Sequence, residues 1–127
     1  MGGTTAGALE PLTEDNVTDD ELAKVAKFRA YMENRDSASN GCMMRATPLA
    51  VWGCNLTKEE LRALSNADVT MTHPHQCPKD ACYLYNLGIQ FLLHNIEDPD
   101  RAEKCFEYCL KETESFKKSR TYGAGGV

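Results

Sequence analysis

A turn signal runs directly into an apolar helical pattern in Ser39-Asn40-Gly41-Cys42-Met43-Met44-Arg45-Ala46-Thr47-Pro48-Leu49-Ala50-Val51-Trp52. Asn and Gly both accept the positive φ angles that tight turns use. The first turn of a helix points unsatisfied backbone N–H groups outward, and such groups bind phosphate and other anions. We therefore predict a helix after this junction and an anion-binding loop in front of it.

Helical periodicity continues on both sides of the junction. Gly, Pro, Asn and Asp interrupt it at short intervals, and no run alternates as a strand does. The sequence therefore predicts an all-α fold, a compact bundle of about five helices. The expected helices run from Thr18 to about Arg35, from Cys42 to Trp52, from Thr57 to between Asn66 and Val69, from Pro78 to His94, and from Asp98-Pro99 through Phe116.

Local signals mark several helix ends. The segments Thr18–Glu21 and Thr57–Glu60 both have the spacing of a capping box, in which a Thr hydroxyl accepts a hydrogen bond from a backbone N–H of the first turn. Pro78 suits the first turn of its helix. The segment Cys42–Trp52 is apolar on all sides, so we expect a buried helix with a kink at Pro48.

The length and composition indicate one domain. A chain of 127 residues with 42% apolar and 26% charged residues is ordinary for a globular protein. The first residues have turn chemistry and little periodicity, and the last are rich in glycine. We expect an irregular N-terminal segment at 1–17, a helical domain at 18–120 and a flexible tail at 121–127.

Charge and hydropathy argue against two classes of partner. The net charge is −5, and the local basic run Lys117-Lys118-Ser119-Arg120 is typical of a solvated helix end, so nucleic acid is not expected. No span approaches the ~18 apolar residues of a membrane helix, and no signal peptide opens the chain. We expect an intracellular, cytoplasmic protein that binds no membrane.

Cysteine and histidine are frequent enough to raise the question of metal. His73, His75, Cys77 and Cys82 have the residue types of a zinc site, but they straddle a loop and a helix start, so their spacing disfavours zinc. No pair of the six cysteines has the C-x-x-C spacing. We expect reduced cysteines that serve as small buried apolar residues.

Three elements resemble those of the ADP-ribosylglycohydrolases, enzymes that remove ADP-ribose from modified targets. The segment Asn40–Leu49 resembles the family's NG(S/A)xMRxxPL element. The segment Thr70–His75, followed by Asp80-Ala81-Cys82, is similar to its S-x-x-T-H-P-H…DA segment, and Gly2–Leu9 is similar to its GxTTxxAL stretch. The three elements occur in the family's order and cover most of the chain.

The resemblance implies a partial ADP-ribosylglycohydrolase-like helical domain that contacts ADP-ribose or an ADP-ribosylated target. It places the ligand against Ser39, Asn40, Gly41, Arg45 and His73, with the histidine near the diphosphate. The complete family domain holds two Mg²⁺ or Mn²⁺ ions on acidic residues of an N-terminal segment and of a D-x-D-T type segment, neither of which we find. We therefore expect no catalytic residue, metal ligand or cofactor in this chain, which matches the middle part of the domain. Hydrolysis is expected only if those segments are supplied elsewhere.

Simpler roles exist for the same residues. Asn40-Gly41 suits a plain turn between helices, and His73 could cap the helix that follows it. Arg45 lies on an apolar helix, where an arginine more often pairs with a carboxylate and fixes the loop than binds a ligand. These structural roles stay open beside the ligand-binding ones.

A function of another class fits the missing metal ligands. The chain would then be a non-catalytic helical structural or interaction subunit derived from this family. The apolar helix Cys42–Trp52 would leave surface uncovered in an isolated monomer. We therefore expect self-association or a protein partner near Met43, Leu49, Val51 and Trp52.

Overall fold

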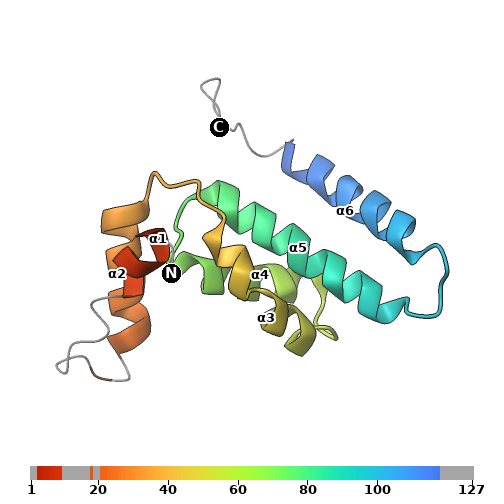
Figure 1. Ribbon diagram of the computed structural model, residues 1–127, viewed down its shortest axis with the longest axis horizontal. Helices are drawn as coiled ribbons and strands as arrows, with labels where there is room; N and C mark the ends of the chain where they lie inside the picture. The colour runs from red at the N-terminus through yellow and green to blue at the C-terminus, as the bar shows by residue number, and fades with distance from the viewer. Residues whose placement is uncertain (1–2, 10–17, 19–20, 118–127) are drawn as a thin grey trace.

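The computed structural model describes residues 3–9, 18 and 21–117 of the chain. These residues form helices and no strand, so the predicted all-α class is confirmed. None of the helices in this part of the chain is long and apolar enough to cross a membrane. Figure 1 shows α1 (Gly3–Leu9), α2 (Leu22–Asn34), the 3-10 helix η3 (Gly41–Arg45), α3 (Thr47–Trp52), α4 (Lys58–Thr70), α5 (Gln76–His94) and α6 (Arg101–Lys117).

Helix α5 is the centre of the fold. It packs against α3, α4, α6 and η3, and Figure 1 shows α6 on one side of it and α3 and α4 on the other. Its buried residues Tyr83 and Leu87 meet Leu61 of α4 and Phe116 of α6 in the main apolar cluster. Since burying one large apolar side chain contributes about 1.5–3 kcal/mol, this cluster holds α4, α5 and α6 together.

Helix α1 corrects the prediction of an irregular segment at 1–17. The residues Gly3–Leu9 are helical, and they pack against α2 and η3. A helix of this length is not stable alone, so packing against neighbouring elements, which periodicity does not reveal, accounts for it. Residues 10–17 and the predicted tail at 121–127 lie outside the described residues, and the domain boundaries stay predictions.

The predicted helix Cys42–Trp52 is two short helices. The chain breaks at Ala46, so Pro48 lies in the first turn of α3, where its missing N–H leaves no helical bond unmade. The structure therefore has no kink inside a helix at Pro48; instead, the helix is interrupted at Ala46, before Pro48. Burial on all sides is also wrong, because only one face of these short helices meets α5: Met44 is 91% and Trp52 74% exposed.

The buried face of α2 consists of Ala26, Ala30 and Asn34, which follow one another at four-residue steps. The apolar side chain of Met32 does not belong to this face, since Met32 is 58% exposed. The narrow buried face consists of two small residues and one polar residue, so α2 approaches its neighbours closely and its last turn carries a buried amide.

Helices α5 and α6 meet at a glycine. A Cβ atom on Gly88 would lie 3.5 Å from the sulfurs of both Cys105 and Cys109 of α6. The face of α6 that meets the other helices therefore includes these cysteines and buried Phe116, whereas Phe106 is 68% exposed. All six cysteines are free thiols, as predicted.

One of the two predicted capping boxes is present. Thr57 Oγ1 accepts a hydrogen bond from the backbone N–H of Glu60 at the start of α4 (3.2 Å). The other is wrong, because the N-cap residue of α2 is Glu21, whose backbone N–H donates to the carbonyl of Thr18.

Replacing Thr57 with alanine should lower the free energy of unfolding by about 1 kcal/mol, because a backbone N–H of α4 loses its acceptor. Thr57→Ser keeps the acceptor oxygen and should retain most of the stability. Urea denaturation followed by circular dichroism measures both changes. An equal loss in the two variants would contradict the capping role.

Candidate ligand-binding site

Three segments of the chain meet at Gly41, the first residue of η3. A Cβ atom built on Gly41 would lie 3.7 Å from His73 Nε2, 3.8 Å from Ser39 Oγ and 3.9 Å from Thr5 Oγ1. These side chains come from the loop between α4 and α5, from the loop before η3, and from α1. We call Thr5, Ser39, Gly41 and His73 the Gly41 cradle, in which polar atoms of three side chains surround the Cβ position of a glycine.

The glycine of the cradle provides space rather than an unusual backbone angle. The positive φ angles that Asn and Gly accept are not used here, because Asn40 has a φ of −101° and Gly41 does not adopt a positive φ. Asn40 is exposed beside the cradle. An alanine at Gly41 would make only ordinary van der Waals contacts, so the fold tolerates a methyl group there.

His73 is fully buried, yet one of its ring nitrogens is unpaired. Nδ1 lies 2.6 Å from Thr72 Oγ1, whereas Nε2 has no hydrogen-bond partner among the described residues. Burial, and after it the positive charge of Arg45, lower the pKa of His73 from its ordinary value of 6.5, and both effects favour the neutral ring. Because an unpaired buried polar atom is costly, Nε2 is the atom most in need of an external partner.

The backbone of the loop between α4 and α5 fixes the position of His73. The backbone N–H of His73 donates a hydrogen bond to the carbonyl of Val69 near the end of α4 (2.7 Å). Pro74 follows and disfavours any continuation of the helix. The residue that caps α5 is His75, whose Nδ1 accepts a hydrogen bond from the N–H of Cys77 (3.1 Å). The capping role that the sequence left open for His73 therefore belongs to His75.

Arg45 is bound to the end of α4. Its Nη2 donates to the carbonyl of Asp68 (2.9 Å), and its Nε lies 3.6 Å from the Asp68 carboxylate. This is the pairing with a carboxylate that the sequence favoured, and it fixes η3 to α4. A direct contact between Arg45 and a ligand stays a prediction.

Cys42 attaches the cradle to α5. It follows Gly41 in the chain, and it is fully buried with Cys82 of α5 and Val69 of α4. The two sulfurs lie 3.3 Å apart in hydrogen-bond contact. This contact lowers the pKa of Cys42, and with burial it raises the pKa of Cys82.

Two further residues of this region were not predicted as ligand contacts, although Thr5 belongs to the stretch Gly2–Leu9 that resembles a family element. Thr5 adds a hydroxyl from α1, and the amide of Asn34 donates to the carbonyls of Thr4 (2.7 Å) and Thr72 (3.1 Å). Asn34 could have been found from its spacing, because it follows the buried alanines of α2 by one turn. A polar residue at such a position indicates an internal hydrogen bond.

The residues considered for zinc do not share a site. His75 caps α5, Cys82 contacts Cys42, and His73 faces the cradle. In the described part of the chain, no group of three or more His, Cys, Asp or Glu side chains is placed to hold a metal ion. These residues therefore do not fit the two cations that the resemblance implies for the complete domain, and we assign no metal ligand.

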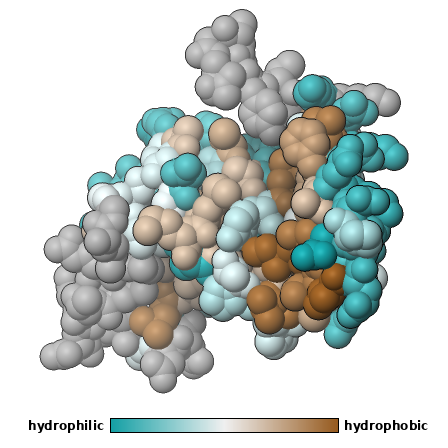
Figure 2. Space-filling model, turned by 45° about the vertical axis from the view of Figure 1, so that its right-hand side comes forward, coloured by the Kyte–Doolittle hydropathy of each residue, from teal (hydrophilic) through white to brown (hydrophobic). Residues whose placement is uncertain are grey.

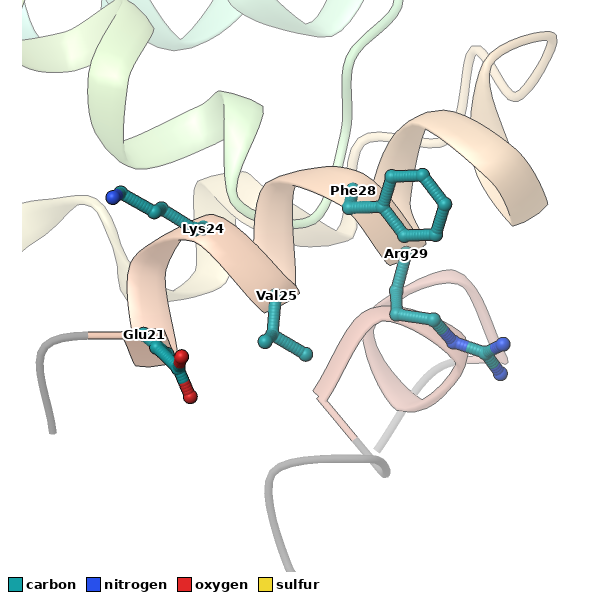
Figure 3. Close-up of a pocket in the computed structure, with 5 residues that line it drawn as sticks. All are labelled: Glu21, Lys24, Val25, Phe28 and Arg29. Carbon is teal, nitrogen blue, oxygen red and sulfur yellow. The ribbon is translucent and has the colours of Figure 1, made fainter. Parts of the chain in front are cut away.

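A separate hollow of about 370 Å³ lies along α2 (Figure 3). It contains no residue of the Gly41 cradle. Among the described residues its lining comes from a single helix, so no second element fixes polar groups around it. Its lining residues are Glu21, Lys24, Val25, Phe28 and Arg29.

Comparison with known protein families places the chain. A family model described as ADP-ribosylglycohydrolase matches residues 1–123. The chain belongs to the ADP-ribosylglycohydrolase family. This confirms the resemblance seen in the sequence, and the ADP-ribosylglycohydrolase match includes every residue of the Gly41 cradle. Neither a curated protein nor a solved structure matches the chain.

The lowered pKa of His73 predicts a loss of stability in mild acid. Below about pH 6.5 the unfolded chain takes up a proton at this ring, whereas the folded chain does not. The free energy of unfolding should therefore fall by up to about 1.4 kcal/mol per pH unit. The fall begins near pH 6.5 and ends at the folded-state pKa. Above that range the ring contributes no pH dependence.

Urea denaturation between about pH 7.5 and 5.5 measures this effect. His73→Gln should remove the fall in stability, whereas the same change at the exposed His94 should leave it. A wild-type stability that does not change over this range would show that the folded state protonates His73 freely.

Proposed function

We propose that this member of the ADP-ribosylglycohydrolase family binds the ADP-ribose group, with the diphosphate of the ligand in the Gly41 cradle. His73 Nε2 carries this proposal, because it is a buried polar atom without a partner among the described residues, and it lies 3.7 Å from the Cβ position of Gly41. A phosphate oxygen near that position would supply the partner that the described residues do not.

The chemistry around the cradle suits an anionic oxygen. A neutral imidazole has one N–H, and when the Thr72 hydroxyl donates to Nδ1 the proton lies on Nε2, which then donates toward the cradle. Ser39 and Thr5 add two hydroxyl groups that can donate as well. Arg45 adds positive charge: the field that lowers the pKa of His73 also attracts a phosphate.

Binding and hydrolysis are separate in this proposal. The cradle consists of hydroxyl groups, an imidazole and backbone, and it includes no carboxylate to hold a divalent cation. We infer that cleavage of an ADP-ribosyl bond requires metal ligands from outside the described residues. The cradle then contributes the position of the diphosphate and not the attack on the glycosidic bond.

Gly41→Ala should weaken ADP-ribose binding at least about tenfold, equivalent to ~1.4 kcal/mol, because the added methyl group occupies the space proposed for a phosphate oxygen. The midpoint of thermal unfolding should change little, since the methyl group meets the fold only at van der Waals distance. Isothermal titration calorimetry and thermal denaturation measure the two effects.

Gly3→Ala is the matched control, because nothing lies within 4 Å of its Cβ position, and it should bind ADP-ribose like the wild type. Wild-type affinity in Gly41→Ala would show that the ligand does not enter the cradle. A wild-type chain that does not bind ADP-ribose at all would refute the proposed function.

A second function, that of an interaction subunit, is favoured by exposed apolar surface. Met44, Val51 and Trp52 are 91%, 50% and 74% exposed around η3 and α3. Figure 2 shows further apolar side chains gathered on the side of the molecule where α5 and α6 lie. Large exposed apolar side chains that gather on one face often mark association sites. We infer that two copies of the chain associate through the α3 face.

Self-association should increase with concentration and carry Trp52 out of water, so the emission of Trp52 should shift to the blue as the chain is concentrated. Light scattering and fluorescence measure this together. Val51→Glu should weaken the association, whereas Met32→Glu on α2 places the same charge on an exposed residue away from both apolar surfaces. A monomer at every concentration, with constant emission, would rule out this function.

A further inference from the structure

Asn34 is a buried amide that joins two walls of the Gly41 cradle. It is the last residue of α2, and its side chain is 8% exposed. One Nδ2 group donates to the carbonyl of Thr4 in α1 (2.7 Å) and to the carbonyl of Thr72 before α5 (3.1 Å). These acceptors lie 30 and 38 residues away from it in sequence. The amide therefore links the end of α2 to two segments that are distant from it in sequence.

Each acceptor is next to a cradle residue. Thr4 precedes Thr5, whose hydroxyl borders the space at Gly41. Thr72 precedes His73, and the Thr72 hydroxyl also contacts Nδ1 of that ring. Because both hydrogen bonds leave the same amide nitrogen, they hold the carbonyls of Thr4 and Thr72 at a fixed distance. This distance in turn sets the separation between the Thr5 hydroxyl and the His73 imidazole.

The amide has a chemical property that few side chains share. A planar NH₂ group carries two N–H donors in fixed directions, whereas a carboxylate has none and a hydroxyl has one. Both acceptors are backbone carbonyls, and the bond to Thr72 is buried, so loss of the donor leaves a carbonyl unpaired inside the protein. An asparagine at the end of the narrow buried face of α2 can therefore donate to two backbone carbonyls at once and hold both in place.

We propose that Asn34 is a positioning residue for ligand binding, which holds the Thr5 and His73 walls of the cradle at the spacing that a phosphate requires. It acts through the Thr4 and Thr72 carbonyls and does not touch the ligand itself. This role rests on the proposed binding of ADP-ribose.

Asn34→Ala tests this role against Asn86→Ala. Asn86 is also a buried asparagine, 1% exposed, but its amide donates to Ser65 Oγ (3.0 Å) between α4 and α5 and not to a segment of the cradle. Both variants remove a buried hydrogen bond, so both should unfold at a lower temperature than the wild type. Only Asn34→Ala should weaken ADP-ribose binding, by about tenfold or more in calorimetry at a temperature where both variants are folded.

A second readout does not need the ligand. Nuclear Overhauser effects among Thr5, Gly41 and the His73 ring in the unliganded full chain report the geometry of the cradle. They should be lost or weakened in Asn34→Ala and preserved in Asn86→Ala. If Asn34→Ala does not fold, Asn34→Gln keeps both donors but moves them by one methylene, and it should show the same two effects.

The outcomes separate the two claims. If the wild type does not bind ADP-ribose, the proposed function is wrong, and the Overhauser comparison decides whether Asn34 sets the spacing of the cradle. If the wild type binds and the Asn34 variants bind equally well with unchanged Overhauser effects, Asn34 is a structural residue only. Equal loss of affinity in Asn86→Ala would also overturn the positioning role.

Discussion

The burial of His73 with only one ring nitrogen hydrogen-bonded is the constraint on which the candidate site depends. An imidazole removed from water needs protein partners for both ring nitrogens, but here only Nδ1 has one, the Thr72 hydroxyl. The fold holds this ring in place from several directions: the end of α4 through Val69, α1 and α2 through Asn34, and the start of η3 at Gly41. So many fixed contacts around one unpaired atom are typical of a prepared binding site.

The frame that positions this site is separate from the site. Tyr83 and Leu87 of α5 join α4 and α6 in an apolar cluster, whereas Cys82, nearer the start of the same helix, anchors η3 through Cys42. Loops and short helices then carry the polar groups, as is usual where a rigid core supports a variable function. The residues that stabilise the fold therefore differ from those that supply polar groups to the site. A change such as one added methyl group at Gly41 can then affect ligand binding without affecting the stability of the fold.

The sequence revealed the parts of the fold and the site that local patterns control. The helices α4 and α5 lie close to where apolar periodicity and the Thr57 cap place them, and Gly41 and His73 were found through motifs. The spacing of Asn34 on the buried face of α2 indicates an internal hydrogen bond, but the helical state of α1 and the partners of Thr5 and Asn34 could not be read in this way. They depend on contacts 30 or more residues apart, which short-range patterns do not contain.

The long-range ¹H–¹⁵N correlation spectrum of the His73 ring tests the central claim most directly, because it shows whether the ring is charged and which nitrogen carries the proton. We expect a neutral ring with the proton on Nε2 at neutral pH, and a shift of the Nε2 signal, with Nδ1 nearly constant, when ADP-ribose is added. A charged ring, a proton on Nδ1, or an Nε2 signal that does not shift when ADP-ribose is added would contradict the binding role assigned to His73.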